Sequence, residues 1–363
     1  MSRRAVRRTT IWLPADTPAR RAEAVERAAH ILRAGGLVAF PTETVYGLGA
    51  DATNPVAVEG IFVAKERPHS DPLIAHIADP ADLERVVASV PDSAHAFIER
   101  FWPGPLTLIA PRAPSIPALV SAGGDTIGVR MPSHPLALEL LRAAGTPIAA
   151  PSANRFMHTS PTTAAHVLAD LNGRIDCVID GGPCAVGVES TVLDVTRDPP
   201  RILRPGGVSL EELRSVDPRV LGPHETPTFV ASARRADVTA KAPGQMERHY
   251  APRTQLLLYD GNGPGTLDAM LKLAAKLTAE GKRVGVLVAD EELAAFEREG
   301  VVVETLGPAN DLPAIARQLY ASLRTLDERR LDVMLAHTFG EEGIGLAVRD
   351  RLRRAAGGHV QSL

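Results

Sequence analysis

The sequence predicts an α+β fold in two parts: a twisted, open sheet with interspersed helices, then a small C-terminal α/β Rossmann-like domain with a parallel sheet. The first observation behind this prediction is the distribution of proline, because only Pro264, Pro308 and Pro313 of the 30 prolines follow residue 252. The second is that apolar runs alternate regularly with helical patterns after this boundary, whereas strands, helices and polar loops are mixed before it. The length of 363 residues also suits two domains.

The C-terminal part contains apolar runs that predict strands at 254–260, 283–290, 301–306 and 331–336. Helical patterns separate or follow these runs, at 266–281, 291–300, 311–330 and 343–358. Strands that are apolar throughout are typical of a parallel sheet covered by helices on both faces. The sequence GNGPG at 261–265 follows the first run but lacks the GxGxxG spacing of a dinucleotide-binding loop, so we interpret it as a turn.

The N-terminal part begins with clear helix signals. Thr17 followed by Pro18 predicts the start of a helix that ends at Gly35 and Gly36, and Asn54 before Pro55 predicts a second helix. The strand candidates are LVAF, PLIAHIA, LTLIAP, TIGVRMP, PIAAPSA, RIDCVID and STVLDVT. Residues 217–252 show little periodicity, which indicates a long linker.

Composition excludes several classes of protein. Hydrophobic residues make up 45% of the chain and charged residues 23%, which excludes a disordered chain, a collagen and a coiled coil. No apolar stretch approaches the roughly 20 residues of a membrane-spanning helix, and no apolar segment of a secretory signal follows the basic start MSRRAVRR. Cys177 and Cys184 are too few for a disulfide framework or a zinc site, so we expect a reducing, cytoplasmic location. A net charge of −3 does not indicate a protein that binds nucleic acid over its whole surface.

The candidate functional residues lie in short polar motifs at the ends of predicted strands. These motifs are PTETVYGLGA (41–50), AKERPHSDPLIAHI (64–77), PGPLT (103–107), GDTIGVRMPSHP (124–135), PSANRFMHTSP (151–161), VEST (188–191), RILRPG (201–206) and HYAP (249–252). They supply four cations (Lys65, Arg67, Arg130 and Arg204) and many hydroxyls, among them those of Thr42, Thr44, Thr126, Ser152, Ser160, Ser190 and Thr191. Cations, hydroxyls and glycine-rich turns suit a polyphosphate, and guanidinium groups also bind carboxylates.

Signatures of covalent or hydrolytic chemistry are missing from the sequence. There is no GxxxxGK[ST], no HExxH and no nucleophile elbow. We therefore expect chemistry by positioning and charge neutralisation, with a metal ion carried by the phosphates and no metal ligands assigned among the protein residues. Taken singly, several residues have plainer explanations: His76 as a core histidine, and Glu43, Asp51 and Glu189 as turn caps or partners of nearby cations.

Together the motifs resemble the YrdC-like threonylcarbamoyl-AMP synthase family in its long, two-domain form. KxRP followed by PLI, PGPxT, GVRxP, PSAN with a later serine-proline, EST and RxG all occur in the family's order, and GQMERHYAP is similar to the family's linker motif. The resemblance implies a YrdC-like catalytic domain at 22–208 with a positively charged concave surface, a linker or lid at 209–252, and a Rossmann-like domain at 253–363. Each motif is weak alone, and it is their number and order that carry the resemblance.

The resemblance also implies a reaction. L-threonine, bicarbonate and ATP, with Mg²⁺ accompanying the ATP, would give L-threonylcarbamoyl-AMP and pyrophosphate. The product would supply the threonylcarbamoyladenosine modification of tRNA next to the anticodon. Other proteins of that pathway would perform the transfer, so contact of this chain with tRNA would be weak or absent.

Matched position by position, the resemblance implies roles for individual residues. Thr44, His76, Arg130, Ala150 and Ser190 match threonine-binding positions. Positions that hold ATP are matched by Arg67, Asp71, Thr126, Ser152, Ser160, Arg204 and Tyr250, and Lys65 and Arg67 are the expected catalytic residues. Asp71 departs from the family, which usually has asparagine there, and a carboxylate at this position would repel phosphate unless it met magnesium or an arginine.

Two other functions remain open from the sequence. The same cations could form a module that binds double-stranded RNA or tRNA, which a steep salt dependence of RNA affinity would indicate. Alternatively, the chain could make a carbamoyl-adenylate from carbamoyl phosphate, and a threonine-dependent release of pyrophosphate would exclude this reaction.

Overall fold

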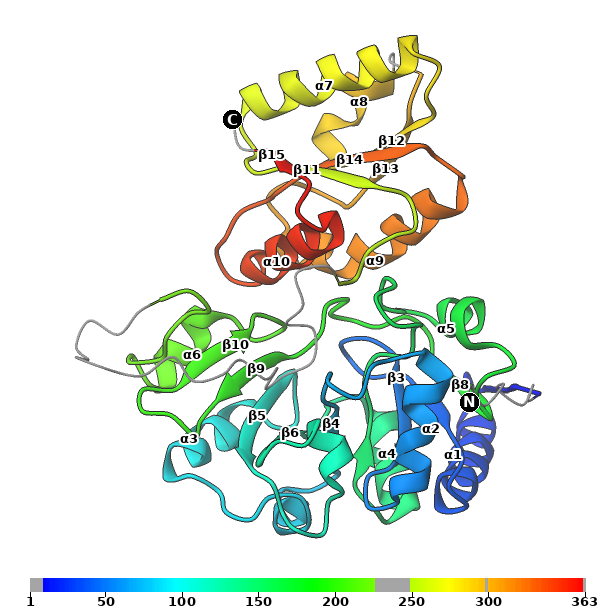
Figure 1. The fold of residues 1–363 in the computed structure, drawn as a ribbon, viewed down its shortest axis with the longest axis vertical. Helices are drawn as coiled ribbons and strands as arrows, with labels where there is room; N and C mark the ends of the chain where they lie inside the picture. Colours follow the sequence, from blue (N-terminus) through cyan, green and yellow to red (C-terminus); the bar gives the residue numbers. More distant parts are fainter. Residues whose placement is uncertain (1–8, 226–248, 298–299, 362–363) are drawn as a thin grey trace. The chain divides into compact units, whose positions relative to one another are not determined.

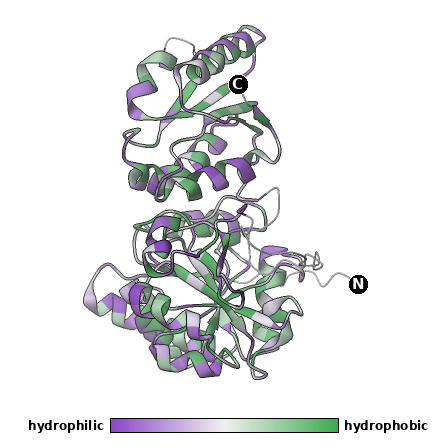
Figure 2. Ribbon diagram, turned by 90° about the vertical axis from the view of Figure 1, so that its left-hand side faces the viewer, coloured by the Kyte–Doolittle hydropathy of each residue, from purple (hydrophilic) through white to green (hydrophobic). Residues whose placement is uncertain are grey.

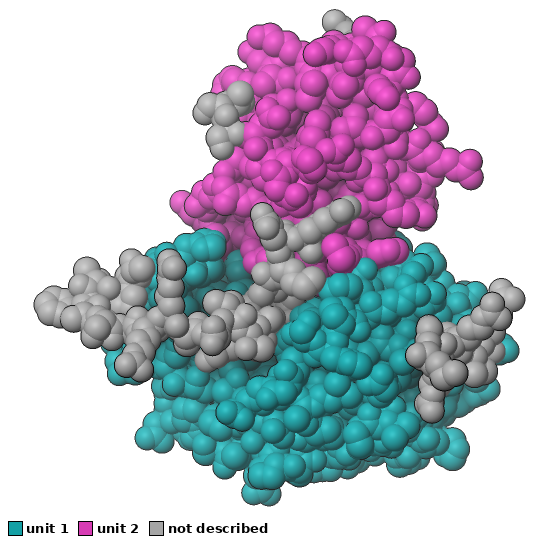
Figure 3. All heavy atoms as spheres, in the orientation of Figure 1, with its two compact units in different colours: residues 1–156, 161–184, 189–245 teal, residues 157–160, 185–188, 246–363 magenta. Residues whose placement is uncertain are grey.

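The computed structural model describes residues 9–225, 249–297 and 300–361. The chain divides into two compact units, coloured separately in Figure 3. Unit 1 consists of residues 1–156, 161–184 and 189–245, and unit 2 of residues 157–160, 185–188 and 246–363.

Unit 1 is built on a ten-stranded mixed sheet with the strand order β1-β8-β2-β3-β7-β4-β6-β5-β9-β10 (Figure 1). The strands are β1 (Ile11–Pro14), β2 (Val38–Phe40), β3 (Gly47–Asp51), β4 (Ile74–His76), β5 (Leu106–Pro111), β6 (Thr126–Arg130), β7 (Ile148–Ala149), β8 (Cys177–Asp180), β9 (Thr191–Asp194) and β10 (Arg201–Arg204). All seven strand candidates of this region are confirmed. Strands β1, β3 and β10 were not predicted.

Six α-helices and two 3₁₀ helices accompany this sheet in the described part of unit 1. They are α1 (Pro18–Arg33), α2 (Pro55–Lys65), η1 (Pro80–Arg85), α3 (Asp92–Phe101), η2 (Ala118–Ser121), α4 (Pro135–Ala144), α5 (Ala164–Leu171) and α6 (Leu210–Val216). The two predicted helix starts are confirmed: the Thr17 side chain accepts a hydrogen bond from the Arg20 N–H, and Asn54 accepts from the N–H groups of Val56 and Ala57.

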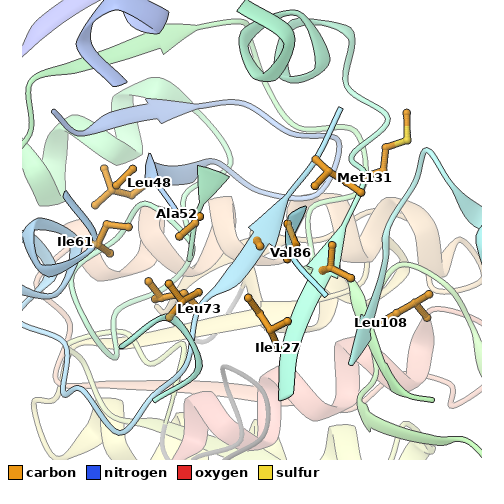
Figure 4. Packing of buried hydrophobic residues seen from close by; sticks show 14 of the residues in the cluster. Leu48, Ala52, Ile61, Leu73, Val86, Leu108, Ile127 and Met131 are labelled. Carbon is orange, nitrogen blue, oxygen red and sulfur yellow. The ribbon is translucent and has the colours of Figure 1, made fainter. Parts of the chain in front are cut away.

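The two faces of the sheet are covered by different helices. Helices α1 and α4 pack on one face, where Leu32 and Leu140 join a cluster with Val38 and Phe40. The larger cluster on the other face includes Leu48, Ile61, Leu73 and Leu108 (Figure 4). Figure 2 shows the corresponding pattern, with hydrophobic strands inside and hydrophilic residues along the outer helices. This packing fixes the strand ends from which the site is built.

Unit 2 contains a five-stranded parallel sheet in the order β13-β12-β14-β11-β15, as predicted for the C-terminal part apart from β15. Its strands are β11 (Leu256–Tyr259), β12 (Val284–Val288), β13 (Val302–Thr305), β14 (Val333–His337) and β15 (Val360–Gln361). Its helices are α7 (Pro264–Ala279), η3 (Asp290–Glu292), α8 (Leu293–Phe296), α9 (Leu312–Glu328) and α10 (Gly345–Ala356). Helices α7 and α8 cover one face of the sheet and α9 and α10 the other (Figure 1).

The expected linker at 209–252 is partly helical. Helix α6 lies within it and is started by a capping box, in which Ser209 and Glu212 bond each other's backbone N–H groups. Residues 226–248 of this segment lie outside the described residues. The same holds for the basic N-terminal stretch at 1–8.

Among the described residues, no helix combines the length and the apolar character needed to span a bilayer.

Candidate active site

Two predicted site residues, His76 and Arg130, and the neighbouring Thr107 lie side by side on adjacent strands of the unit 1 sheet, and we call these three residues one rung. Strands β4 and β6 run parallel with His76 paired to Arg130. Strands β5 and β6 run antiparallel with Leu108 opposite Val129, and this register sets Thr107 beside Arg130 on the other side. Because side chains alternate along a strand, His76, Arg130 and Thr107 lie on the same face of the sheet.

Arg130 is held by three different partners although it is almost fully buried. Its Nε donates to the Gly104 carbonyl at 3.2 Å, and one terminal nitrogen donates to Thr44 Oγ1 at 3.0 Å. The other terminal nitrogen lies 2.6 Å from Glu43 Oε1. The guanidinium is therefore fixed in orientation, and its charge is balanced by a buried carboxylate.

Thr44 and Glu43 come from the loop between β2 and β3, which is buried along its length. The Thr42 hydroxyl donates to the Val45 carbonyl at 2.6 Å and accepts from the Thr44 N–H at 3.2 Å. The hydroxyls of Thr42 and Thr44 are 2.8 Å apart. These bonds close a tight turn that presents Thr44 and Glu43 to Arg130.

His76 is uncharged at neutral pH. Burial, together with the nearby Arg130 guanidinium, lowers its pKa to about 3. Its Nδ1 lies 3.2 Å from the Ile74 carbonyl. His76 therefore contributes hydrogen-bonding atoms to the site but no charge.

A second group of residues gathers around Ser190. Its hydroxyl is 2.8 Å from Thr107 Oγ1, and Arg204 donates to the Ser190 carbonyl at 2.9 Å and to its hydroxyl at 3.2 Å. The chain approaches this point closely: a Cβ at Gly206 would lie 2.3 Å from the backbone of Ser190 and Thr191. Glycine is required there so that Arg204 can reach the serine.

Arg67 and Asp71 form a buried ion pair. Arg67 lies 3.0 Å from Asp71 Oδ2 and donates to the carbonyls of Asp71 and Pro72, at 3.1 and 2.6 Å. Burial raises the pKa of Asp71, and the charges of Arg67, Lys65 and Arg204 act against this rise. Asp71, where the family usually has asparagine, thus pairs its carboxylate with the Arg67 guanidinium.

Lys65 ends helix α2 and is only 1% exposed. Its Nζ donates to the Ser152 carbonyl at 2.5 Å and to the Asn154 carbonyl. Burial, and then the neighbouring Arg67, hold its pKa well below the usual value. In this structure the Lys65 amine fastens the PSAN loop, which carries Ser152.

The remaining predicted residues of unit 1 lie at other points of the same sheet. Thr126 begins β6 and Arg130 ends it, so about 13 Å separates them along the strand. Ala150 follows β7, and its N–H donates to the Ile74 carbonyl at 2.9 Å, next to the strand that carries His76.

Ser160 and Tyr250 both belong to unit 2, and the structure brings their segments together there. The Ala251 N–H donates to the Met157 carbonyl at 2.8 Å, and Thr159 Oγ1 donates to the Tyr250 carbonyl at 3.5 Å. The Tyr250 ring lies under the Arg351 guanidinium, 4.8 Å from it, and is 1% exposed. Two predicted nucleotide contacts from distant parts of the sequence are thus neighbours.

Three of the four predicted cations surround one carboxylate, and the fourth, Arg130, lies on the neighbouring strand β6. Lys65, Arg67 and Arg204 all act on the Asp71 carboxylate. Arg204 bonds Ser190, which meets Thr107 on the rung that holds Arg130. All four side chains are at least nine-tenths buried, so the charge is concentrated in a medium where water screens it poorly.

Two residues next to these cations, Thr107 and Glu43, were not among the predicted site residues. Thr107 stood in the PGPLT motif but was not singled out, and its role depends on the register of β5 with β6. Glu43 was interpreted as a turn cap or a partner of a nearby cation, and the second interpretation is confirmed by its ion pair with Arg130. The threonine-rich PTET motif was the available signal for it.

Comparison with known proteins covers nearly the whole chain. Residues 30–206 match the family described as "Telomere recombination", and residues 208–357 match "Threonylcarbamoyl-AMP synthase, C-terminal domain". The threonylcarbamoyl-AMP synthase of Pyrococcus abyssi is 45% identical over 91% of this chain and 93% of its own length. That of Bacillus subtilis is 43% identical over 93% of this chain and 94% of its own. The crystal structure of P. abyssi Sua5 complexed with L-threonine is similar with a TM-score of 0.87 and 41% identity, over 98% of this chain and 99% of that one.

Proposed function

Because the chain belongs to the two-domain threonylcarbamoyl-AMP synthase family, we propose that it joins L-threonine, bicarbonate and ATP into L-threonylcarbamoyl-AMP and releases pyrophosphate. The enzyme is a nucleotidyltransferase, and its product supplies the threonylcarbamoyladenosine modification of tRNA. The observation that carries this proposal is the burial of four cations in unit 1: Lys65, Arg67 and Arg204 around Asp71, and Arg130 paired with Glu43.

The reaction brings anions together, which explains why such buried cations are useful. The amine of threonine must attack a carbon derived from bicarbonate, and an oxygen of the resulting carbamate must attack the α-phosphorus of ATP. Both steps need the repulsion between negative groups to be reduced and the reacting atoms to be aligned. Buried, pre-oriented guanidinium groups meet both needs without reorganising during the reaction.

The threonine end of the site is the rung with Arg130. Arg130 binds the carboxylate, while Thr44, Ser190 and the neutral His76 supply hydrogen bonds to the substrate. Ala150 borders the amino acid through its backbone. A pocket that hydrogen-bonds the side-chain hydroxyl rejects alanine more strongly than serine, because the loss of one methyl group is worth only about 1–3 kcal/mol.

The ATP end of unit 1 is the group around Asp71, and the family resemblance adds Ser160 and Tyr250 as nucleotide contacts. Arg67 and Arg204 neutralise phosphate, Thr126, Ser152 and Ser160 donate hydrogen bonds, and Tyr250 contacts the nucleotide. Lys65 is the proposed catalytic lysine near the phosphates, and its amine also holds the loop that carries Ser152.

Mg²⁺ accompanies ATP and would be held mainly by the phosphates. No group of three or more His, Cys, Asp or Glu side chains able to hold a metal occurs in the described part of the chain. The buried Asp71 carboxylate, whose Oδ2 lies 3.0 Å from Arg67, would be a protein group able to approach such an ion. The ion would supply charge neutralisation on the phosphates.

The product is a mixed anhydride that water hydrolyses, so its use requires a transfer enzyme. Proteins of the tRNA threonylcarbamoyl transfer pathway are the partners expected for this chain, which itself contacts tRNA weakly or not at all. We place the reaction in the cytoplasm, in keeping with the two free, buried cysteines among the described residues.

The decisive experiment measures pyrophosphate release from ATP with and without L-threonine and bicarbonate. We expect release only when both are present. Release that needs carbamoyl phosphate instead would indicate the carbamoyl-adenylate reaction. Binding of duplex RNA that weakens steeply with salt, without any release, would indicate an RNA-binding module.

A further inference from the structure

Glu43 is a buried carboxylate with an incomplete set of partners. The residue is 8% exposed, and its Oε1 lies 2.6 Å from a terminal nitrogen of Arg130. Within the described residues, neither oxygen has a donor that meets strict hydrogen-bond geometry, and the groups that face the carboxylate are the Arg130 guanidinium and the backbone N–H groups of Glu43 and Ser133. A buried carboxylate normally accepts several hydrogen bonds, so these oxygens have capacity for a further cationic donor.

The charges around Glu43 are balanced before any substrate binds. The Arg130 guanidinium opposes the carboxylate and holds its pKa below the ordinary value despite burial. His76 adds no charge, because its pKa is about 3. A ligand that carries one positive and one negative group keeps this balance, whereas a simple carboxylate would leave an uncompensated negative charge in a buried site.

We propose that Glu43 binds the α-ammonium group of the amino-acid substrate, so that the Glu43–Arg130 pair selects a zwitterion. This inference rests on the proposed function and adds to it the residue that recognises the amine. The Arg130 side chain can serve the carboxylate at the same time, because its hydrogen bonds to Gly104 and Thr44 use two of its five N–H groups and the nitrogen that faces Glu43 is not in hydrogen-bond geometry with it. Once the ammonium group has given up a proton, the same nitrogen forms the bond to the bicarbonate carbon, and water leaves as the carbamate forms, so the contact with Glu43 also positions the nucleophile.

The test compares two ligands in two proteins. Isothermal titration calorimetry measures binding of L-threonine and of (R)-3-hydroxybutyrate, which is threonine without its amino group, to the wild type and to Glu43→Gln. We expect the wild type to prefer L-threonine, and Glu43→Gln to reduce this preference by about 10- to 100-fold, the usual range for a hydrogen bond to a charged group. Binding of 3-hydroxybutyrate should stay the same or tighten, because the Glu43 carboxylate no longer competes with the ligand carboxylate for the Arg130 guanidinium.

A structural role of Glu43 gives a different pattern. If Glu43 served only to orient Arg130, both ligands would weaken by the same factor and the preference would not change, which overturns the proposal. Glu43→Asp, which keeps the charge, should retain part of the preference, and loss of preference as complete as in Glu43→Gln would also count against it. Exposed Glu139→Gln is the matched control, and ATP affinity and tryptophan fluorescence verify that each variant is folded. Failure of the wild type to bind L-threonine would instead refute the proposed function.

Discussion

Replacement of Arg130 by methionine tests whether its buried charge is needed for stability as well as for binding. Methionine keeps much of the volume but removes the guanidinium that faces Glu43 at 2.6 Å. Removing one partner of a buried ion pair typically costs about 3–5 kcal/mol, because the other charge remains buried without compensation. The double variant Arg130→Met/Glu43→Gln removes both charges, and we expect it to recover most of that loss.

The pH dependence of the single variant has a defined sign. In the wild type Arg130 keeps the pKa of Glu43 below its ordinary value of 4.5, so the pair stabilises the fold above that pH. Without Arg130, burial is the largest remaining influence on the carboxyl group, opposed only by the backbone N–H groups of Glu43 and Ser133, and we expect it to raise the pKa above that of the unfolded chain. Stability of Arg130→Met should therefore fall as the pH rises from about 4.5 towards the new folded-state pKa.

Urea unfolding followed by tryptophan fluorescence is a suitable assay. Both tryptophans, Trp12 and Trp102, belong to unit 1, so the signal reports on the unit that carries the substitution. A loss of about 3–5 kcal/mol corresponds to a midpoint shift of about 1–2 M urea for a slope near the upper end of the usual range. Equal shifts at pH 5 and pH 8, or a double variant no more stable than the single one, would refute the reasoning.

Two further outcomes are expected. Removal of everything after residue 225 should leave unit 1 folded, with the circular dichroism and fluorescence of a native sheet, but pyrophosphate release should fall by more than tenfold because Tyr250 is lost; full activity would show that no residue beyond 225 contributes to catalysis. Cys177 and Cys184 should resist alkylation at pH 8 and react only in urea, because burial raises the pKa of each thiol to about 12, and rapid labelling of the native protein would show that one of them is accessible.

The fold was predictable where its signals are local. Thr17 and Asn54 cap their helices as expected, since a cap needs only the few residues around it. Strand β1 was missed because it has only four residues, lies at the sheet edge, and begins with three apolar residues in a row, so its sequence does not alternate although its burial does. Helix α6 was missed although Ser209 and Glu212 form a readable capping box, because the seven-residue helix is short and its surroundings lack periodicity.

Motif order predicted which residues belong to the site, and their roles stay predictions, but it could not predict the contacts between them. Motif order identified Arg130 and His76, yet their place on one rung follows from the pairing of β4 with β6, which no local pattern encodes. The same holds for Thr107, which reaches Ser190 only through the register of β5. Lys65 was expected at the phosphates, and that role stays a prediction, while its amine bonds the carbonyls of Ser152 and Asn154.

The net charge of the chain was a poor guide to the site because buried charges act locally. A chain with a net charge of −3 still concentrates Lys65, Arg67 and Arg204 around one carboxylate, Asp71. These groups lose their hydration when the protein folds. Binding of an anionic substrate therefore does not require the free energy of desolvating them a second time. Local burial and pairing, rather than overall charge, therefore decide which ligands such a site can hold.

Unit 2 restrains the conformation of Tyr250, a predicted nucleotide contact. Tyr250 has a positive φ of 59°, a conformation that a bulky side chain adopts only when its surroundings hold it there. Arg351 over its ring, Tyr320 with its ring centroid 5.8 Å away and the Thr159 hydroxyl provide that restraint, and all of them belong to unit 2. The Rossmann-like sheet itself contributes no predicted site residue. Its helices α9 and α10 instead carry Tyr320 and Arg351, which hold Tyr250 of the HYAP motif in a fixed conformation.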